Sequence, residues 1–218
     1  MRRRPMTEMS YAAVVFDLGG VVFPSPLDVF RAYERDHGLT HRFLSEVVLA
    51  DPENGAWSRL ERGELNFDEF CDAFDAECAA HGGAVSAREL MDAVRVGLAA
   101  RPEMVTAIGA IRRHGLKTAA LTNNWADDPG RTNRASPTDD WFDVMVESAV
   151  EGLRKPDPRI YALVCERLDV SPPATVFLDD LGANLKPARE LGMTTIKVAE
   201  PEAALAELEA VLGFELTD

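Results

Sequence analysis

Five short apolar segments, spaced along a chain of 218 residues, place the strongest constraint on the fold. Several of them are nearly continuous apolar runs, whereas a strand with one solvated face would alternate between apolar and polar residues. Helical patterns lie between and after the later four segments, and such alternation is typical of a parallel sheet covered on both faces. We therefore predict an α/β fold. The expected strands are Ala12–Leu18, Leu116–Thr122, Val144–Ala149, Thr175–Asp179 and Thr194–Val198.

The expected helices of this α/β part end at recognisable stop signals. Three of them stop at Gly115, Gly192 and Gly213. Glycine is common just past a helix end because it tolerates a left-handed conformation. The expected helices are Pro102–His114, Pro158–Leu168, Leu185–Leu191 and Pro201–Leu212.

The long interval between the first and second expected strands contains no convincing strand. Helix start signals occur there at Asn66 and in the capping box from Ser86 to Glu89. An insertion after the first strand would lie over the strand ends, where a lid excludes water and selects substrates. The expected helices of this insertion are Leu27–His37, His41–Ala50, Phe67–Ala80 and Ala87–Leu98.

Together these patterns predict a Rossmann-like parallel sheet core with an inserted all-helical cap. The core comprises residues 12–25 and 101–218, the cap comprises residues 26–100, and residues 1–11 form a flexible N-terminus. A polar loop rich in Asp, Pro, Thr and Ser is expected at residues 126–140.

The charge balance argues against nucleic-acid and membrane partners. Lys and Arg total 23 against 37 Asp and Glu, a net charge of −14, whereas both partners favour clustered positive charge. No stretch of about 18 apolar residues marks a membrane span and no signal-peptide core follows the basic start, so we expect a cytoplasmic protein. The cysteines, Cys71, Cys78 and Cys165, lack CxxC spacing and are interpreted as small buried residues.

Most of the candidate chemistry lies at the carboxyl ends of the expected strands or just beyond them. Open parallel sheets bind their ligands at this edge. We therefore expect a crevice that holds three carboxylates, a hydroxyl, two amides and a lysine. In chain order these residues are Asp17, Thr122, Asn123, Asn124, Lys155, Asp179 and Asp180.

Three carboxylates in one crevice repel one another, and their unpaired burial would cost several kcal/mol each. Lys155 supplies one positive charge. Mg²⁺, a hard cation that binds one or two carboxylates together with phosphate oxygens, would supply the rest. The four histidines show no metal-ligand spacing, which argues against a transition metal. A carboxylate nucleophile beside Mg²⁺ and a lysine suits phosphoryl transfer through an aspartyl-phosphate.

The same residues resemble, in order and spacing, the four motifs of the haloacid dehalogenase-like (HAD) hydrolase superfamily. The motifs are Asp17 in FDLGGVV, Thr122 in LTNN, Lys155 in RKPDP and Asp179-Asp180 in FLDD. Within that superfamily, LTNNWADD, VESAVEGLRKPDPRIY and FLDDLGANLKPARELGMTTIKV are similar to the N-terminal phosphatase domain of soluble epoxide hydrolases. FDLGGVVFPSP with KPDPRIY is similar to the HAD domain of acyl-CoA dehydrogenase-like multidomain proteins.

This resemblance implies a role for each matching residue. Asp17 would be the nucleophile, and the other residues would bind the phosphoryl group, hold Mg²⁺ or support these contacts. The catalytic residues implied are Asp17, Thr122, Asn123 and Lys155. The metal ligands implied are Asp17, the backbone carbonyl of Gly19, and Asp180. The supporting or substrate-binding residues implied are Asp179, Asn184 and Asn124.

Each of these assignments has a structural alternative. Thr122 and Asn123 would otherwise form a turn, and Asp179 and Asp180 would otherwise cap the following helix. Lys155 would otherwise be a solvated surface lysine, and Asn184, which precedes Pro187, would otherwise be a helix N-cap. Trp125 could line the site beneath the cap, but an aromatic packing anchor is the interpretation that we prefer.

Gly19 departs from the pattern of superfamily phosphatases, in which this position holds an aspartate that protonates the leaving group and then activates water. Loss of general acid–base help typically costs about 10²–10⁴ in rate. Our leading interpretation is a Mg²⁺-dependent phosphatase that is slow, limited to good leaving groups, or supplied with an acid by Asp28 or another cap residue.

Two other interpretations stay open. The first is a non-catalytic module that binds phosphate and Mg²⁺, for which the retained pocket would suffice. The second is a dehalogenase-type carbon hydrolase, whose halide leaves without a proton. For a phosphatase, the expected substrate is a small phosphorylated metabolite or a lipid phosphate.

Overall fold

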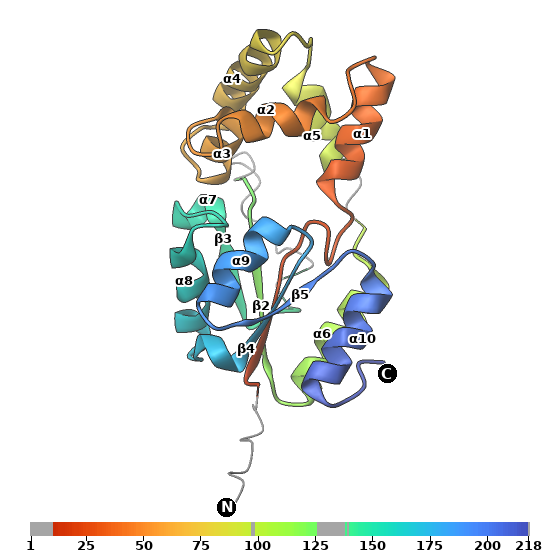
Figure 1. Cartoon of the computed structure of the whole chain (residues 1–218), viewed down its shortest axis with the longest axis vertical. Helices are drawn as coiled ribbons and strands as arrows, with labels where there is room; N and C mark the ends of the chain where they lie inside the picture. Colours follow the sequence, from red (N-terminus) through yellow and green to blue (C-terminus); the bar gives the residue numbers. More distant parts are fainter. Residues whose placement is uncertain (1–10, 97–98, 126–137, 139, 218) are drawn as a thin grey trace, which may run out of the picture.

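The predicted parallel sheet lies at the centre of the core (Figure 1). The computed structural model describes residues 11–96, 99–125, 138 and 140–217. Among these residues every strand pair is parallel and the strand order is β3-β2-β1-β4-β5. The strands are β1 (Ala13–Phe16), β2 (Lys117–Thr122), β3 (Val144–Glu147), β4 (Thr175–Asp179) and β5 (Thr194–Lys197).

The direction in which strands are added reverses at β1. The chain moves from β1 outward through β2 and β3, then returns to the other side of β1 for β4 and β5. Ligands of doubly wound sheets bind at such a switch point, beyond the carboxyl ends of the strands. Phe16 of β1 pairs with Ala120 of β2 and Leu178 of β4, so the three strands deliver their last residues to one edge.

Helices cover both faces of the sheet, which explains why β1, β2 and β4 are buried almost throughout. Val14 and Phe16 of β1 are buried in the apolar cluster on one face. Ala13 and Val15 are buried in the cluster on the opposite face. The helices of the first cluster are α6 (Pro102–Arg113) and α10 (Pro201–Leu212), and those of the second are α8 (Pro158–Leu168) and α9 (Gly182–Glu190).

Helices α1 to α5 form a separate layer beyond the carboxyl ends of the strands, which we call the cap (Figure 1). They share one buried apolar cluster. At its centre the ring of Trp57 lies 5.2 Å from Phe30 and 5.7 Å from both Phe70 and Phe74. The cap helices are α1 (Pro26–Asp36), α2 (Phe43–Ala50), α3 (Ala56–Glu61), α4 (Phe67–Ala80) and α5 (Ala87–Val96).

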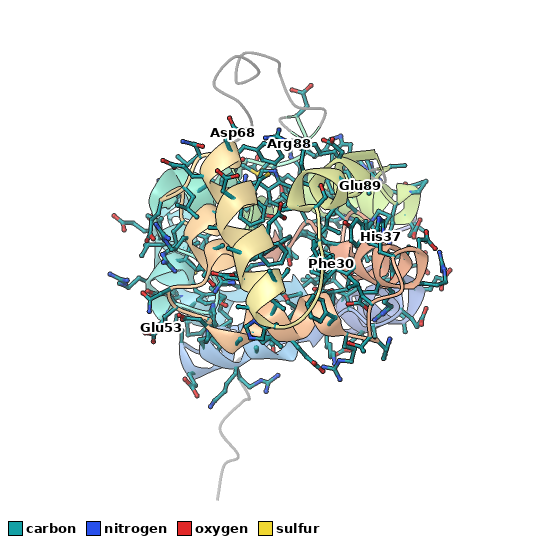
Figure 2. The ribbon with its side chains drawn as sticks, turned by 90° about the horizontal axis from the view of Figure 1, so that it is seen from above. Phe30, His37, Glu53, Asp68, Arg88 and Glu89 are labelled. Carbon is teal, nitrogen blue, oxygen red and sulfur yellow. The ribbon has the colours of Figure 1, made fainter. Side chains whose placement is uncertain are left out.

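Polar contacts join the cap helices on their outer surface. Arg88 of α5 pairs with Asp68 of α4, and Glu89 of α5 lies 3.5 Å from His37 at the end of α1 (Figure 2). The predicted start of α4 is confirmed, because Asn66 is the N-cap of a complete capping box. Since exposed ion pairs contribute little to stability, the apolar cluster is what holds the cap together.

Several element boundaries differ from those predicted. Neither α3 nor α7 (Ser148–Glu151) was predicted, because helices of 6 and 4 residues give too little periodicity to detect. The strand expected at Val144–Ala149 ends at Glu147, where α7 begins. The helix expected at Leu185–Leu191 already begins at Gly182.

Four simpler predictions concern features away from the sheet edge. The flexible N-terminus (1–11) and the polar loop (126–140) fall almost entirely outside the described residues and stay predictions. All three cysteines are buried and unpaired. Within the described residues, no helix combines the length and the hydropathy that a membrane span requires.

Candidate active site

Three carboxylates meet at the sheet edge above β1 and β4. Asp17 directly follows β1, while Asp179 and Asp180 lie at the end of β4. One oxygen from each carboxylate lies within 4.8 Å of the other two. Asp17 and Asp179 are buried, so their repulsion is weakly screened by solvent. The structure therefore brings together the three carboxylates that the strand ends predicted.

Lys155 lies at the centre of this cluster. Its Nζ is 2.8 Å from Asp17 Oδ1 and 2.8 Å from Asp179 Oδ2. Its side chain is 1% exposed, so the alternative of a solvated surface lysine is wrong. Burial opposes the ammonium charge, but the two carboxylates outweigh burial and raise the pKa of Lys155 above its usual value. Lys155 is therefore charged at neutral pH.

One lysine does not neutralise three carboxylates. Burial, reinforced by Asp179, raises the pKa of Asp17 well above its usual value despite the neighbouring Lys155. Burial and Asp179 likewise raise the pKa of Asp180, to about 6. Burial is the larger cause of both shifts, and repulsion from Asp179 adds to it; a divalent cation would relieve this repulsion.

Asp179 is fully engaged by protein donors. Its Oδ1 accepts hydrogen bonds from the Leu181 backbone N–H at 2.8 Å and from Asn184 Nδ2 at 3.1 Å, and its Oδ2 accepts from Lys155 Nζ. Asn184 lies inside α9, whose N-cap is Leu181, so the N-cap alternative for Asn184 is wrong. This bonding pattern makes Asp179 the residue that orients Lys155.

Asp17 and Asp180 retain free coordination capacity. Asp17 Oδ1 accepts from the Leu18 backbone N–H at 2.7 Å and from Lys155, which leaves Oδ2 without a bond to any described residue. Within the part of the chain that the structure describes, Asp180 Oδ2 has one long contact, 3.4 Å from Ser25 Oγ. Because Mg²⁺ binds one or two protein carboxylates, this pair fits that cation.

Asn123 joins the loop after β2 to the loop that carries Lys155. Its Oδ1 accepts from the Lys155 backbone N–H at 2.8 Å, and its Nδ2 donates to the Lys155 carbonyl at 3.0 Å. Thr122 is buried at the end of β2, and among the described residues its hydroxyl contacts only the Asn123 carbonyl, at 3.4 Å. Asn124 instead bonds to Glu147 and to the start of α7, away from these contacts.

The two glycines after Asp17 have different structural roles. Gly20 has a φ of 82°, and a Cβ there would overlap the Asp180 carboxylate, so both conformation and close approach require glycine. Gly19 lies outside the left-handed region, and a Cβ there would meet Pro26 Cδ at 3.4 Å, an ordinary contact. The absence of an acid–base side chain at Gly19 is therefore not imposed by the turn.

A comparison with protein families accounts for this arrangement. The model of the haloacid dehalogenase-like hydrolases matches residues 11–192 of the chain. The chain belongs to the haloacid dehalogenase-like hydrolase family. The matched range contains β1 to β4 and every predicted site residue, so the resemblance inferred from the motifs is confirmed.

Relatives of this HAD-like hydrolase include both groups that the motifs resemble. Acyl-CoA dehydrogenase family member 10 of Mus musculus is 41% identical over 95% of this chain and 20% of that protein. Bifunctional epoxide hydrolase 2 of Sus scrofa is 34% identical over 95% of this chain and 40% of that protein. The chain therefore spans less than half the length of these two relatives. Phosphatase MT3486 of Mycobacterium tuberculosis is 32% identical over 85% of this chain and 86% of that protein.

The fold is shared with a solved HAD family enzyme. A crystal structure of this enzyme from Bacteroides thetaiotaomicron contains magnesium and inorganic phosphate. It is 22% identical to this chain, covers 86% of this chain and 94% of its own, and has a TM-score of 0.61. At this identity the likeness establishes the shared architecture.

Three residues to which the motifs assign no role also reach the site of this HAD-like hydrolase. Ser25 is the N-cap of α1 and contacts Asp180, and its position before Pro26 is a helix start signal that could have identified it. Arg154 and the cap residue Glu61 contact each other and the site loops, and no local pattern marks Glu61. Trp125 packs against the cap cluster, as its interpretation as an anchor requires.

Proposed function

We propose that this HAD-like hydrolase is a Mg²⁺-dependent phosphomonoester hydrolase that forms an aspartyl-phosphate at Asp17. The observation that carries the proposal is the buried Asp17 carboxylate, 2.8 Å from Lys155 and beside Asp180, a second carboxylate with free coordination capacity. Enzymes with a carboxylate nucleophile that act on carbon need no such second carboxylate. The phosphatase name of the relative MT3486 and the magnesium and phosphate of the solved enzyme give further support.

Asp17, Asp180 and the backbone carbonyl of Gly19 are the residues that would hold Mg²⁺. When bound, the cation would offset the surplus negative charge and polarise the oxygens of the transferring phosphoryl group. Lys155 would bind the same oxygens, and the Thr122 hydroxyl would donate to them. Within the described residues this hydroxyl makes a single long hydrogen bond, 3.4 Å, so it is available for that bond.

The reaction would proceed in two displacements at phosphorus. A carboxylate oxygen of Asp17 forms a bond to phosphorus while the ester P–O bond breaks, and the leaving oxygen takes its proton from water. A second water then attacks the aspartyl-phosphate, releases inorganic phosphate and restores the carboxylate. Asp28, a candidate replacement acid, lies on the exposed surface of α1 and pairs with Arg31 at 2.6 Å, so we give it no part in these steps.

Gly19→Asp is expected to raise kcat/KM for an alkyl phosphate by about 10²-fold, because the new carboxyl can protonate a poor leaving group. The rise for p-nitrophenyl phosphate should be much smaller, since its leaving group departs without a proton. The turn accommodates the change, as a Cβ at position 19 makes only ordinary contacts with Pro26. Gly109→Asp in α6 serves as the control. Equal gains on both substrates would show that leaving-group protonation is not limiting.

Binding of Mg²⁺ is expected to strengthen as the pH rises through about 6, because the cation must displace the proton from Asp180. Without metal, the folded protein holds this proton more tightly than the unfolded chain does. The contribution of Asp180 to stability therefore falls as the pH rises from about 4 to about 6. Mg²⁺ should raise the Tm more at pH 7.5 than at pH 5. An equal rise at both values would contradict the assignment of Asp180 as a ligand.

The experiment that tests the proposed function is hydrolysis of p-nitrophenyl phosphate by the purified protein with and without Mg²⁺. Turnover that requires the metal would support the proposal. Absence of turnover, combined with a Tm raised by Mg²⁺ and inorganic phosphate, would favour a binding module. Metal-independent release of halide from a 2-haloacid would favour a carbon hydrolase. A panel of small phosphorylated metabolites and lipid phosphates would then define the substrate.

A further inference from the structure

A carboxylate of the cap, Glu61, bonds directly to the loops that carry Asn123 and Lys155. Glu61 is the last residue of α3 and is buried. Its Oε2 accepts hydrogen bonds from Arg154 Nε at 2.6 Å and from Asn123 Nδ2 at 3.3 Å, and its Oε1 accepts from Trp57 Nε1 at 3.0 Å. The carboxylate thus gathers donors from two core loops and from its own helix.

Arg154 contacts the cap at two points. Besides the bond to Glu61, its Nη1 donates to the carbonyl of Pro52 at 3.2 Å. The side chains of Arg154 and Glu61 are 19% and 10% exposed, so solvent screens this ion pair weakly. Lys155 is the next residue along the chain. The contacts of Arg154 therefore anchor the backbone directly before Lys155 to the cap.

The side chain of Asn123 extends this contact into the site. Its amide donates to Glu61 and to the Lys155 carbonyl, and accepts from the Lys155 backbone N–H. All three contacts depend on one orientation of the amide plane. Glu61 therefore helps to fix the Asn123 side chain, which hydrogen-bonds both the N–H and the carbonyl of Lys155.

The end of α3 also touches the core through its backbone. Gly63, just beyond Glu61, has a φ of 68°, and a Cβ there would overlap the carbonyl oxygen of Ala149 in α7. A backbone contact this close exists only while α3 lies against the core. The bonds of Glu61 to the core therefore form only when the cap is docked.

We propose that Glu61 and Arg154 are positioning residues that form a latch, which holds Asn123 and the Lys155 loop in place while the cap is docked. The inference deepens the proposed function and rests on it. If the cap lifted, Arg154 would lose Glu61 and Pro52 together, and Asn123 would lose its bond to Glu61. The latch thereby links an ordered Lys155 to the docked cap, which is the state that excludes water from the site.

Glu61→Gln tests the latch, because it keeps the shape of the side chain and removes the charge that pairs with Arg154. We expect kcat for p-nitrophenyl phosphate to fall by about 10-fold to 10²-fold with little change in KM, since the lysine is misplaced but the substrate still enters. Amide hydrogen exchange of residues 153–158 in the substrate-free protein should become faster. The double variant with Arg154→Met should lose no more activity than the poorer single variant, because both act through one contact.

Glu77→Gln is the matched control for a role limited to cap stability. Glu77 lies in α4, and its Oε1 accepts from the Ala56 backbone N–H at 2.8 Å, so it holds the opposite end of α3. This variant should speed amide exchange near Ala56 and lower the Tm while kcat stays unchanged. An equal loss of kcat in Glu61→Gln and Glu77→Gln would overturn the latch.

The exchange measurement separates failure of the latch from failure of the proposed function. If the wild-type protein hydrolyses no phosphomonoester, the proposed function fails, and amide exchange still decides whether Glu61 orders the Lys155 loop. Unchanged exchange of residues 153–158 in Glu61→Gln would overturn the latch whatever the activity of the wild-type protein.

Discussion

Asp17→Asn is expected to abolish the Mg²⁺-dependent hydrolysis of p-nitrophenyl phosphate, with kcat lower by on the order of 10⁴-fold or more. An amide oxygen cannot form the acyl-phosphate bond, and the variant also loses one of the two carboxylates that would bind the cation. The fold should survive, because asparagine has nearly the same shape and Lys155 keeps its 2.8 Å contact with Asp179. Initial rates and intact-protein mass after an acid quench measure turnover and any phosphorylated intermediate.

Asp36→Asn is the control for this substitution. Asp36 lies at the end of α1, is exposed and pairs with Arg35, so the same chemical change there should leave turnover intact. Wild-type rates in Asp17→Asn would refute the assignment of the nucleophile. A phosphoryl adduct that persists in Asp17→Asn would place the covalent step on another residue.

The carboxyl ends of the central strands could be predicted because each combines two signals. Asp17 and Asp179 end apolar runs too continuous for a one-sided sheet, and a parallel sheet brings such ends to a common edge. Lys155 lies in the turn beyond β3, and both this position and its motif marked it as a candidate. Its burial against Asp17 and Asp179 follows from the imbalance of charge that three carboxylates create.

The latch residues could not be predicted because their partners are distant in the sequence. Glu61 meets Arg154 across 93 positions, from a helix too short to show periodicity. Nothing in the local sequence distinguishes Glu61 from the exposed Asp and Glu residues that give the chain its net charge of −14. The separate roles of Gly19 and Gly20 were equally hidden, since only the structure shows which glycine approaches Asp180.

Lys155→Met is expected to abolish activity and to lower the free energy of unfolding by about 3–5 kcal/mol at pH 8 without metal. The methionine fills a similar volume, but Asp17 and Asp179 are then buried without their shared cation. Protonation of Asp17, whose pKa is already raised above its usual value, relieves this repulsion. The loss of stability should therefore shrink as the pH falls towards 5. Urea unfolding at both pH values, with and without Mg²⁺, measures the effect.

Lys186→Met provides the control, because Lys186 is exposed on α9 and its nearest acidic partner, Glu190, is 4.0 Å away. We expect it to change stability by less than about 0.5 kcal/mol at either pH. If Mg²⁺ returns part of the stability lost in Lys155→Met but no activity, then the lysine has a catalytic role that the metal cannot replace. Equal stability of Lys155→Met and the wild-type protein at pH 8 would mean that Asp17 and Asp179 do not both carry charge in the metal-free protein. The surplus negative charge on which the magnesium assignment rests would then be absent.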